Sequence, residues 1–371
     1  MRGGDRATLM DTTTSALATA WGVFQGWSYS GAVPAHVQYV TDPPAVTAAA
    51  LEFLAEVLGE PLNLALVVGG TVGTVLALTA YLFVRPTIPD VEALRGALDE
   101  YREFVPWMLR LSFGLPLVGA GFAGYLFSPA VAIEARVFQV ALGFLILCGL
   151  ATRAVAAVAL VSYLVALALF FPDLLLAIEY LPGLVALILV GSGRPSADHM
   201  LNEVAATEGT LYGRIDPVHG LAERFNVIVE PYERFVPTVL RTGLGVGFVY
   251  LGLTQKLANP SRALAVVSKY DLTSVVPVDA GLWVVGAGLT EIGVGVLLIA
   301  GYLTRASAAT AFLMLVLTLF GLPDDPVLAH VTLFGMLSAV FTLGSGPLSV
   351  DRWLSEADTG EADEPGATPT D

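Results

Sequence analysis

Runs of apolar residues, each close to the length of a membrane span, recur along almost the whole chain. A helix of about 20 apolar residues crosses the hydrocarbon core of a bilayer, which is ~30 Å thick. The chain has 371 residues, of which 55% are hydrophobic and 14% are charged. Soluble domains carry roughly 25% charged residues. The sequence therefore predicts an all-α polytopic membrane protein that crosses the cell membrane several times, with the lipid bilayer as its main partner.

Nine spans are expected, one ahead of two sets of four. The first covers Leu62–Val84. The first set lies near Phe104–Phe127, Arg136–Leu150, Ala154–Phe171 and Leu174–Val190, and the second near Phe235–Leu257, Gly281–Ala300, Ala306–Leu322 and Val327–Leu343. Most arginines fall in the segments on one side of this arrangement, and the positive-inside bias places that side in the cytoplasm.

The two sets of spans read as copies of one unit. YREFVPWMLRLSFG at Tyr101–Gly114 and YERFVPTVLRTGLG at Tyr232–Gly245 are identical at 7 of 14 positions, at an offset of 131 residues. GLATRA at 149–154 answers GYLTRA at 301–306, and GSGRPSADHML at 191–201 answers GSGPLSVDRWL at 344–354. Three matches in the same order predict a tandem duplication. Because each unit has four spans, both units face the same way, as a parallel repeat does.

The expected architecture is two parallel four-helix transmembrane bundles preceded by one extra transmembrane helix. It divides the chain into a signal-like, external N-terminal segment (1–60), the extra helix with a cytoplasmic linker (61–100), the first repeat (101–201), a cytoplasmic linker (202–231), the second repeat (232–355) and an acidic disordered tail (356–371). Residues 12–30 are compatible with a cleaved signal, a tenth span or a peripheral segment. About 21 extra residues near 259–280 should cover the external face of the second bundle.

The charge balance excludes some partners. The net charge is −15, from 33 acidic and 18 basic residues, and the only lysines are Lys256 and Lys269. This excess argues against nucleic acid or anionic lipid as a partner. It fits a solvated acidic tail, and a sharper hypothesis is a halophilic composition adapted to a high-salt cytoplasm.

The second copy resembles the DoxX/DoxD-like family of small four-helix membrane proteins. The stretches that carry the resemblance are GVGFVYLGLTQKL at Gly245–Leu257 and TEIGVGVLLIAGYLTRASA at Thr290–Ala308. With both copies counted, the resemblance covers about 100–355. The residues that match the family pattern are Arg241, Gly245, Gly252, Lys256, Glu291, Gly295, Gly301, Thr304, Arg305, Gly344, Ser349 and Asp351.

The resemblance implies an accessory membrane subunit of a quinone- or sulfur-linked oxidoreductase complex, with other subunits of that complex as partners and quinone as the candidate ligand. The first copy departs from the family pattern at two positions. Tyr125 stands where the second copy has Lys256 (125 + 131), and Gln139 stands where it has Glu291 (139 + 152). If the family's chemistry needs this charged pair, only the second copy keeps it.

Three residues are candidates for intramembrane function: Lys256, Glu291 and His330. Glu291 lies near the middle of its span, where a carboxylate must be protonated, paired or exposed to a polar cavity. It could relay a proton, accept a quinol hydroxyl, or simply join helices. Lys256 could extend to the membrane interface or reach toward Glu291. His330 could exchange protons near neutral pH or be a satisfied interfacial residue.

The other family-motif residues read as structural. Arg241 should pack against the bundle or the headgroups, and Arg305 should cap a helix C-terminus. Gly245, Gly252 and Gly295 allow close helix approach, and Gly301 and Thr304 belong to the motif that leads into the turn at Arg305. We identify no metal-binding motif, no covalently bound cofactor and no catalytic residue, so enzymatic activity stays open. A small-molecule or proton-coupled transporter and a non-catalytic scaffold are the alternative functions.

Overall fold

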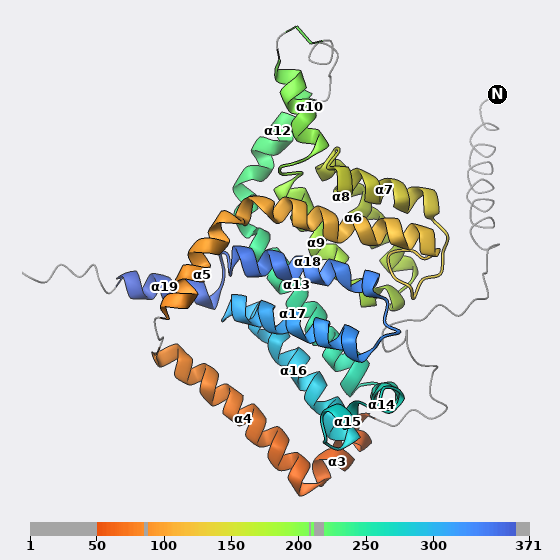
Figure 1. Ribbon diagram of the computed structural model, residues 1–371, viewed down its shortest axis with the longest axis vertical. Helices are drawn as coiled ribbons and strands as arrows, with labels where there is room; N and C mark the ends of the chain where they lie inside the picture. The colour runs from red at the N-terminus through yellow and green to blue at the C-terminus, as the bar shows by residue number, and fades with distance from the viewer. Residues whose placement is uncertain (1–49, 85–87, 208, 211–218, 361–371) are drawn as a thin grey trace, which may run out of the picture.

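The protein is an all-α polytopic membrane protein. The computed structural model describes residues 50–84, 88–207, 209–210 and 219–360, and within these ranges it consists of helices and their connections, without a strand (Figure 1). The expectations for residues 1–49 and 361–371, including the signal-like stretch, lie outside the described residues.

Six helical stretches of the described residues are long and apolar enough to cross a membrane: Pro61–Val84, Arg102–Ala123, Thr152–Leu169, Arg224–Leu257, Ala280–Ala300 and Thr304–Gly321. Three shorter apolar helices accompany them: Arg136–Cys148, Tyr180–Val190 and Val327–Leu343. Each of the nine overlaps one of the spans predicted from the sequence.

The first unit contains α6 (Val105–Ala123), α7 (Arg136–Cys148), α8 (Thr152–Leu169) and α9 (Tyr180–Val190), the last preceded by the 3₁₀ turn η2 (Asp173–Ala177). Helix α6 ends before the predicted Phe127 because Gly124 has a φ of +81°, a left-handed conformation that closes a helix. Phe127 and Val131 then fold back into the core. A 3₁₀ turn, η1 (Arg102–Phe104), leads into α6.

The second unit contains α13 (Val236–Leu251), α16 (Ala280–Ala300), α17 (Thr304–Gly321) and α18 (Val327–Leu343). Here α13 does not stop where α6 does. It continues as a π-helix, η4 (Gly252–Leu257), before the inserted α14 (Pro260–Lys269) and the short α15 (Leu272–Val275). Helix α14 packs against α16 and η4.

The two units share one hydrophobic core instead of forming separate bundles. The first helix of each unit packs on the last helix of the other, α6 on α18 and α13 on α9 (Figure 1). A glycine allows the close approach at both contacts. A Cβ on Gly335 would clash with Ser112, and one on Gly243 would lie 2.2 Å from Pro182. The two contacts use the same pair of positions in the unit: Ser112 corresponds to Gly243 (112 + 131), and Pro182 corresponds to Gly335 (182 + 153).

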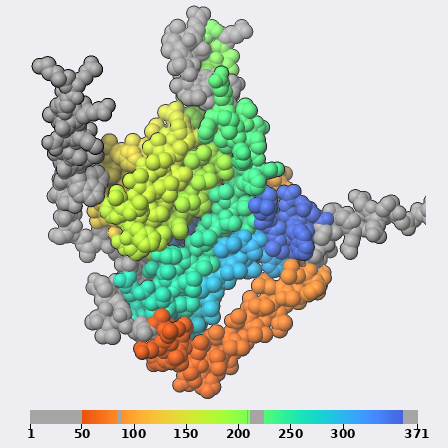
Figure 2. Space-filling view, turned by 180° about the vertical axis from the view of Figure 1, so that it is seen from behind, coloured from red at the N-terminus to blue at the C-terminus, as the bar shows by residue number. Residues whose placement is uncertain are grey.

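The extra membrane helix, α4 (Pro61–Val84), stands apart from this core. Most of its residues are exposed, and Figure 2 shows it as an orange rod separated from the blue and cyan helices along its middle. The preceding α3 (Ala50–Gly59) packs Phe53 and Val57 beside the start of α16. Near the other end of α4, the Tyr302 hydroxyl donates to the Leu78 carbonyl at 2.8 Å. The helix is therefore attached near its ends.

Several connections are more helical than the sequence predicts. The linker expected over 202–231 includes the end of α10 (Ala197–Ala206), α12 (His219–Val229) and part of η3 (Glu230–Phe235). Helix α5 (Pro89–Glu100) lies in the linker ahead of α6. Helix α19 (Val350–Gly360) runs into the segment predicted as a disordered tail, so that tail begins inside a helix.

Candidate functional site

A buried arginine fixes the same end of each unit. Arg241 is 0% exposed and donates to four carbonyls, of Leu298 (2.9 Å), Ile299 (2.5 Å), Ser345 (2.8 Å) and Leu348 (2.6 Å). The first two carbonyls belong to the last turn of α16, and the other two follow the end of α18. Backbone acceptors at such places have no partner within a helix. The expectation that Arg241 packs against the bundle or headgroups missed this role, in which it ties three segments together.

Arg110 repeats this arrangement in the first unit. Its guanidinium donates to the carbonyls of Ile146, Leu147, Ser192 and Pro195, at 2.6 to 3.1 Å. Each acceptor lies 152 or 153 residues before its counterpart in the second unit. The two units therefore share one arginine-centred framework.

The turn between the second and third helices is capped by an aspartate. The Asp351 carboxylate accepts the Leu303 and Thr304 amides at 2.8 and 2.9 Å, and the Thr304 hydroxyl at 2.8 Å. The turn requires a left-handed residue, Gly301, at φ +66°. In the first unit the Asp198 carboxylate accepts the matching amides, of Ala151 and Thr152, but not the Thr152 hydroxyl. As expected for a helix cap, Arg305 donates to the last-turn carbonyls Phe341 and Thr342.

Glycines bring α16 into backbone contact with α13 and with the first residue of η4. A Cβ on Gly245 would lie 2.5 Å from the Gly295 carbonyl oxygen, and one on Gly252 would lie 2.8 Å from that of Gly288. Small residues at such contacts allow tight packing of membrane helices, where no hydrophobic drive holds helices together. The two helices are consequently fixed close together where Lys256 and Glu291 project.

Lys256 and Glu291 meet at this contact. The Lys256 Nζ lies 2.5 Å from Glu291 Oε1, and the two side chains are 19% and 17% exposed. The π-helix η4 carries Lys256, and single π-turns often occur at functional sites. The second carboxylate oxygen, Oε2, is buried and has no hydrogen-bond partner within the described part of the chain. Of the two arrangements considered for Lys256, the structure has the one that reaches Glu291.

The matching position in the first unit is uncharged. Gln139 is fully buried, and with its amide nitrogen turned toward Tyr125 it donates to the Tyr125 carbonyl at 2.6 Å and accepts the Phe127 amide at 3.0 Å. Tyr125 and Phe127 belong to the chain that folds back after α6 ends. The first unit thus closes this position with its own backbone.

His330 lies elsewhere, at the start of α18. It is buried, with Nδ1 3.2 Å from the Pro326 carbonyl and Nε2 3.4 Å from Asp325 Oδ2. The structure therefore does not bring His330 together with Lys256 and Glu291 into one site. No group of three His, Cys, Asp or Glu residues in the described ranges could hold a metal ion.

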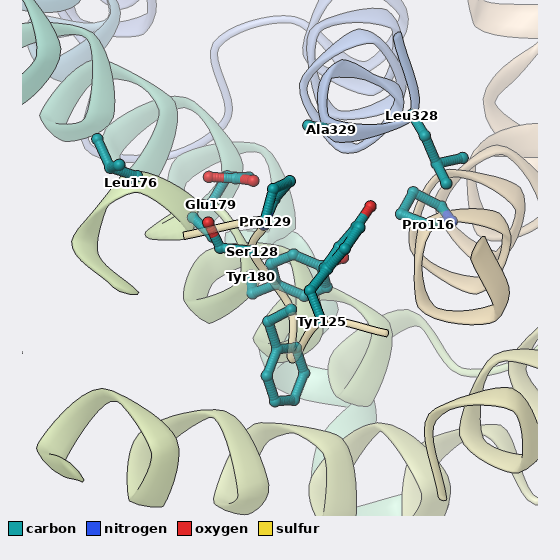
Figure 3. A pocket seen from close by; sticks show the side chains of 11 residues that line it. Pro116, Tyr125, Ser128, Pro129, Leu176, Glu179, Tyr180, Leu328 and Ala329 are labelled. Carbon is teal, nitrogen blue, oxygen red and sulfur yellow. The ribbon is translucent and has the colours of Figure 1, made fainter. Parts of the chain in front are cut away.

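A buried polar contact that sequence reasoning did not predict joins the two units. The Thr332 hydroxyl donates to Glu179 Oε1 at 3.2 Å, between α18 and the start of α9. Glu179 and Thr332 occupy equivalent positions of the two units, because 179 + 153 is 332. That equivalence is the signal in the sequence that could have drawn attention to this pair. Beside it lies a cavity of about 10 Å³, roughly the space of one water molecule, where Figure 3 shows Glu179, Ser128 and Tyr180 close together.

An exposed ion pair links the insertion to the connection between α17 and α18. Asp324 lies 2.9 Å from Lys269 Nζ and accepts the Tyr270 hydroxyl at 2.9 Å. The hydrogen bond from Lys269, and then that from Tyr270, lowers the pKa of Asp324, and the same bond to Asp324 raises the pKa of Lys269.

A known protein family matches part of the chain. The DoxX family model matches residues 236–324, which include α13, η4, the insertion, α16 and α17, and therefore both Lys256 and Glu291. No curated protein and no solved structure matches the chain.

Proposed function

We propose that this multi-pass membrane protein, which carries a DoxX domain over residues 236–324, is an accessory subunit of a quinone- or sulfur-linked oxidoreductase complex in the cell membrane. The domain makes it a DoxX-like membrane protein. The accessory role is our inference from the family resemblance, together with the Lys256–Glu291 pair that lies within the matched segment.

The buried Oε2 of Glu291 is the observation that carries this proposal. A carboxylate oxygen removed from water is costly unless it has a partner. Lys256 satisfies Oε1 and leaves Oε2 to accept another donor. The hydroxyl of a quinol would supply such a donor from within the bilayer, so the residues present fit this class of ligand.

In this role the two side chains would divide the work. The Glu291 carboxylate would accept the proton of the hydroxyl, and the Lys256 ammonium, 2.5 Å from Oε1, would hold the carboxylate in position. A bound quinol would supply the electrons, and a partner subunit would accept them, while this chain would accept the proton.

The test is a Glu291→Gln substitution in the full chain, purified with whatever subunits accompany it. Loss of a positioned general base costs on the order of 10²-fold or more in rate, so quinone-linked turnover should fall by about that factor while the same subunits copurify. Glu134→Gln is the matched control, because Glu134 is an acid of the first unit that pairs with Arg136 at 3.4 Å outside the candidate site. Unchanged turnover with unchanged assembly in Glu291→Gln contradicts the proposal.

The Glu179–Thr332 contact favours a second candidate, a proton-coupled transporter. Two parallel units that meet at a buried acid resemble the arrangement of transporters whose sites lie between repeats. In proteoliposomes, addition of a transported solute should change the internal pH, and Glu179→Gln should abolish that change. No solute-driven pH change across a broad panel of solutes rejects this candidate.

A further inference from the structure

A groove lies at one end of the second unit, where η3 leads into α13 and α19 follows α18. It has a volume of about 440 Å³. The residues that line it are Arg234, Phe235, Pro347, Leu348, Ser349, Arg352, Trp353 and Glu356. Neither the Lys256–Glu291 pair nor the contact between the two units uses any of these residues.

The groove carries a local positive charge although the protein as a whole is acidic. Arg352 donates to Glu356 at 2.7 Å, so these two charges are paired. Arg234 is the other cation that lines the groove. The Arg234 guanidinium lies 4.9 Å from the centroid of the Phe235 ring, and no carboxylate within the described ranges pairs with it. Among the described residues that line the groove, two guanidinium groups against one carboxylate give a net charge of +1.

Large apolar side chains are exposed beside these charges. Leu348 is 78% exposed and has a φ of +60°, and Trp353 is 67% exposed on the first turns of α19. Tryptophan is enriched where hydrocarbon meets headgroups, because one part of its ring is apolar and the other is polar. The groove lies beside the membrane ends of α13 and α18, so these side chains are placed at that boundary.

The first unit has no equivalent groove chemistry. Its matching residues are Glu103 for Arg234, Pro195 for Leu348, His199 for Arg352 and Met200 for Trp353. Glu103 places a negative charge where the second unit has its unpaired cation. The groove is therefore not a by-product of the shared arginine-centred framework.

We propose that this groove binds the headgroup of an anionic membrane lipid. The phosphodiester would lie against Arg234 and Arg352, since guanidinium groups match phosphate oxygens with paired hydrogen bonds. Its single negative charge balances the +1 of the groove. The glycerol and upper acyl chains would lie against Trp353 and Leu348. The overall charge of −15 predicts no affinity for anionic lipid, and this groove is a local exception.

Native mass spectrometry of the full chain with added phosphatidylglycerol tests the proposal. Wild type should retain phosphatidylglycerol more tightly than phosphatidylcholine. Arg234→Gln and Arg352→Gln should each weaken retention by about tenfold, as expected for loss of one charge-assisted contact. Arg234→Lys should keep most of the affinity. Arg102→Gln is the matched control, because Arg102 is exposed in η1, ahead of α6, and pairs with Asp99 at 3.0 Å.

Three results would overturn the proposal. Equal retention by wild type and by the Arg234→Gln/Arg352→Gln double variant would show that the groove does not hold the lipid. Equal retention of phosphatidylcholine would remove the anionic preference. Displacement of the lipid by glycerol 3-phosphate at the same concentration would identify a free phosphate compound, and not a lipid, as the ligand.

Discussion

At the contact between α13 and α16, a lysine reaches a glutamate, whereas at the matching contact between α6 and α7 a glutamine closes onto backbone. The surroundings of the two positions are alike. The same buried arginine, the same aspartate cap and the same glycine approach occur in both units. The framework evidently does not need charge at this position, because the first unit is built without it.

The difference arises from how each first helix ends. Helix α6 stops at Gly124, and the chain returns toward the core, where it supplies the backbone groups that satisfy Gln139. Helix α13 continues as a π-helix and thereby extends Lys256 to Glu291. We propose that both regions descend from one duplicated unit, and that the second kept the charged pair for a role beyond stability.

The largest effect should come from the arginines that the two units share. Replacing Arg241 or Arg110 with methionine leaves several buried carbonyls without donors, each of which costs about 1–3 kcal/mol. We expect either variant to lose ~4 kcal/mol or more of unfolding free energy in detergent. Arg102→Met, an exposed control, should change stability by less than about 0.5 kcal/mol. If only one of the two buried arginines matters, the frameworks are not equivalent.

Exchanging the amide for an acid in the first unit should have the next largest effect. Gln139→Glu places an acid in a fully buried position and removes the donor to Tyr125. The expected loss is about 3 kcal/mol, measured by denaturant unfolding. The converse change, Glu291→Gln, keeps an acceptor for Lys256 and should cost less than about 1 kcal/mol. Equal losses in the two variants would contradict the contrast between the two units.

Breaking the ion pair from the lysine side should cost less than introducing a buried acid. Lys256→Met leaves Glu291 without its partner, but both side chains are partly exposed, so the expected loss is only about 1–2 kcal/mol. The double variant Lys256→Met/Glu291→Leu should recover most of that stability, because no unpaired charge remains. A double variant as unstable as the single one would show that the pair itself stabilises the fold.

The smallest effect should come from the insertion that only the second unit has. Hydrogen bonds from Lys269 and Tyr270, two residues of the insertion, lower the pKa of Asp324 below its ordinary 3.8. The stabilisation that these bonds give is therefore present above pH 3.8 and is lost as the pH falls through the lowered pKa. Because the pKa of Lys269 is raised, its share is present below 10.5 and is lost as pH rises through the raised value. Asp324→Asn should reduce the dependence of the melting temperature on pH in both of these pH ranges. An unchanged pH profile would show that the pair is only a surface contact.

The sequence predicts the parts of this fold that depend on local pattern. Apolar runs place the spans, and Gly301 and Thr304 mark a helix end and the turn after it, because a left-handed glycine and a capped hydroxyl are local requirements. The closeness of Lys256 and Glu291 could be predicted only to within one to two helical turns. The π-helix that completes the approach changes the register of α13 and leaves no simple periodic signal.

The contacts between distant segments could not be predicted from such patterns. Packing of α6 on α18 depends on the space that Gly335 leaves for the Ser112 side chain, a fit between residues more than 200 positions apart. The position of Arg241, one turn inside its helix, predicts packing against the bundle or the headgroups and does not identify its acceptors. The carbonyls it binds become available only after α16 and α18 have ended beside it.

The attachment of α4 near its ends has a consequence for how the protein fits membranes of different thickness. Phe53 and Val57 hold one end through α3, and Tyr302 holds the other through Leu78, while the middle is exposed all round. A hydrophobic helix adjusts to a thicker or thinner hydrocarbon layer chiefly by tilting. Because α3 and the hydrogen bond from Tyr302 restrain α4 near its ends, a change in its inclination would have to be taken up at the α3–α4 junction or at Tyr302, in the turn before α17.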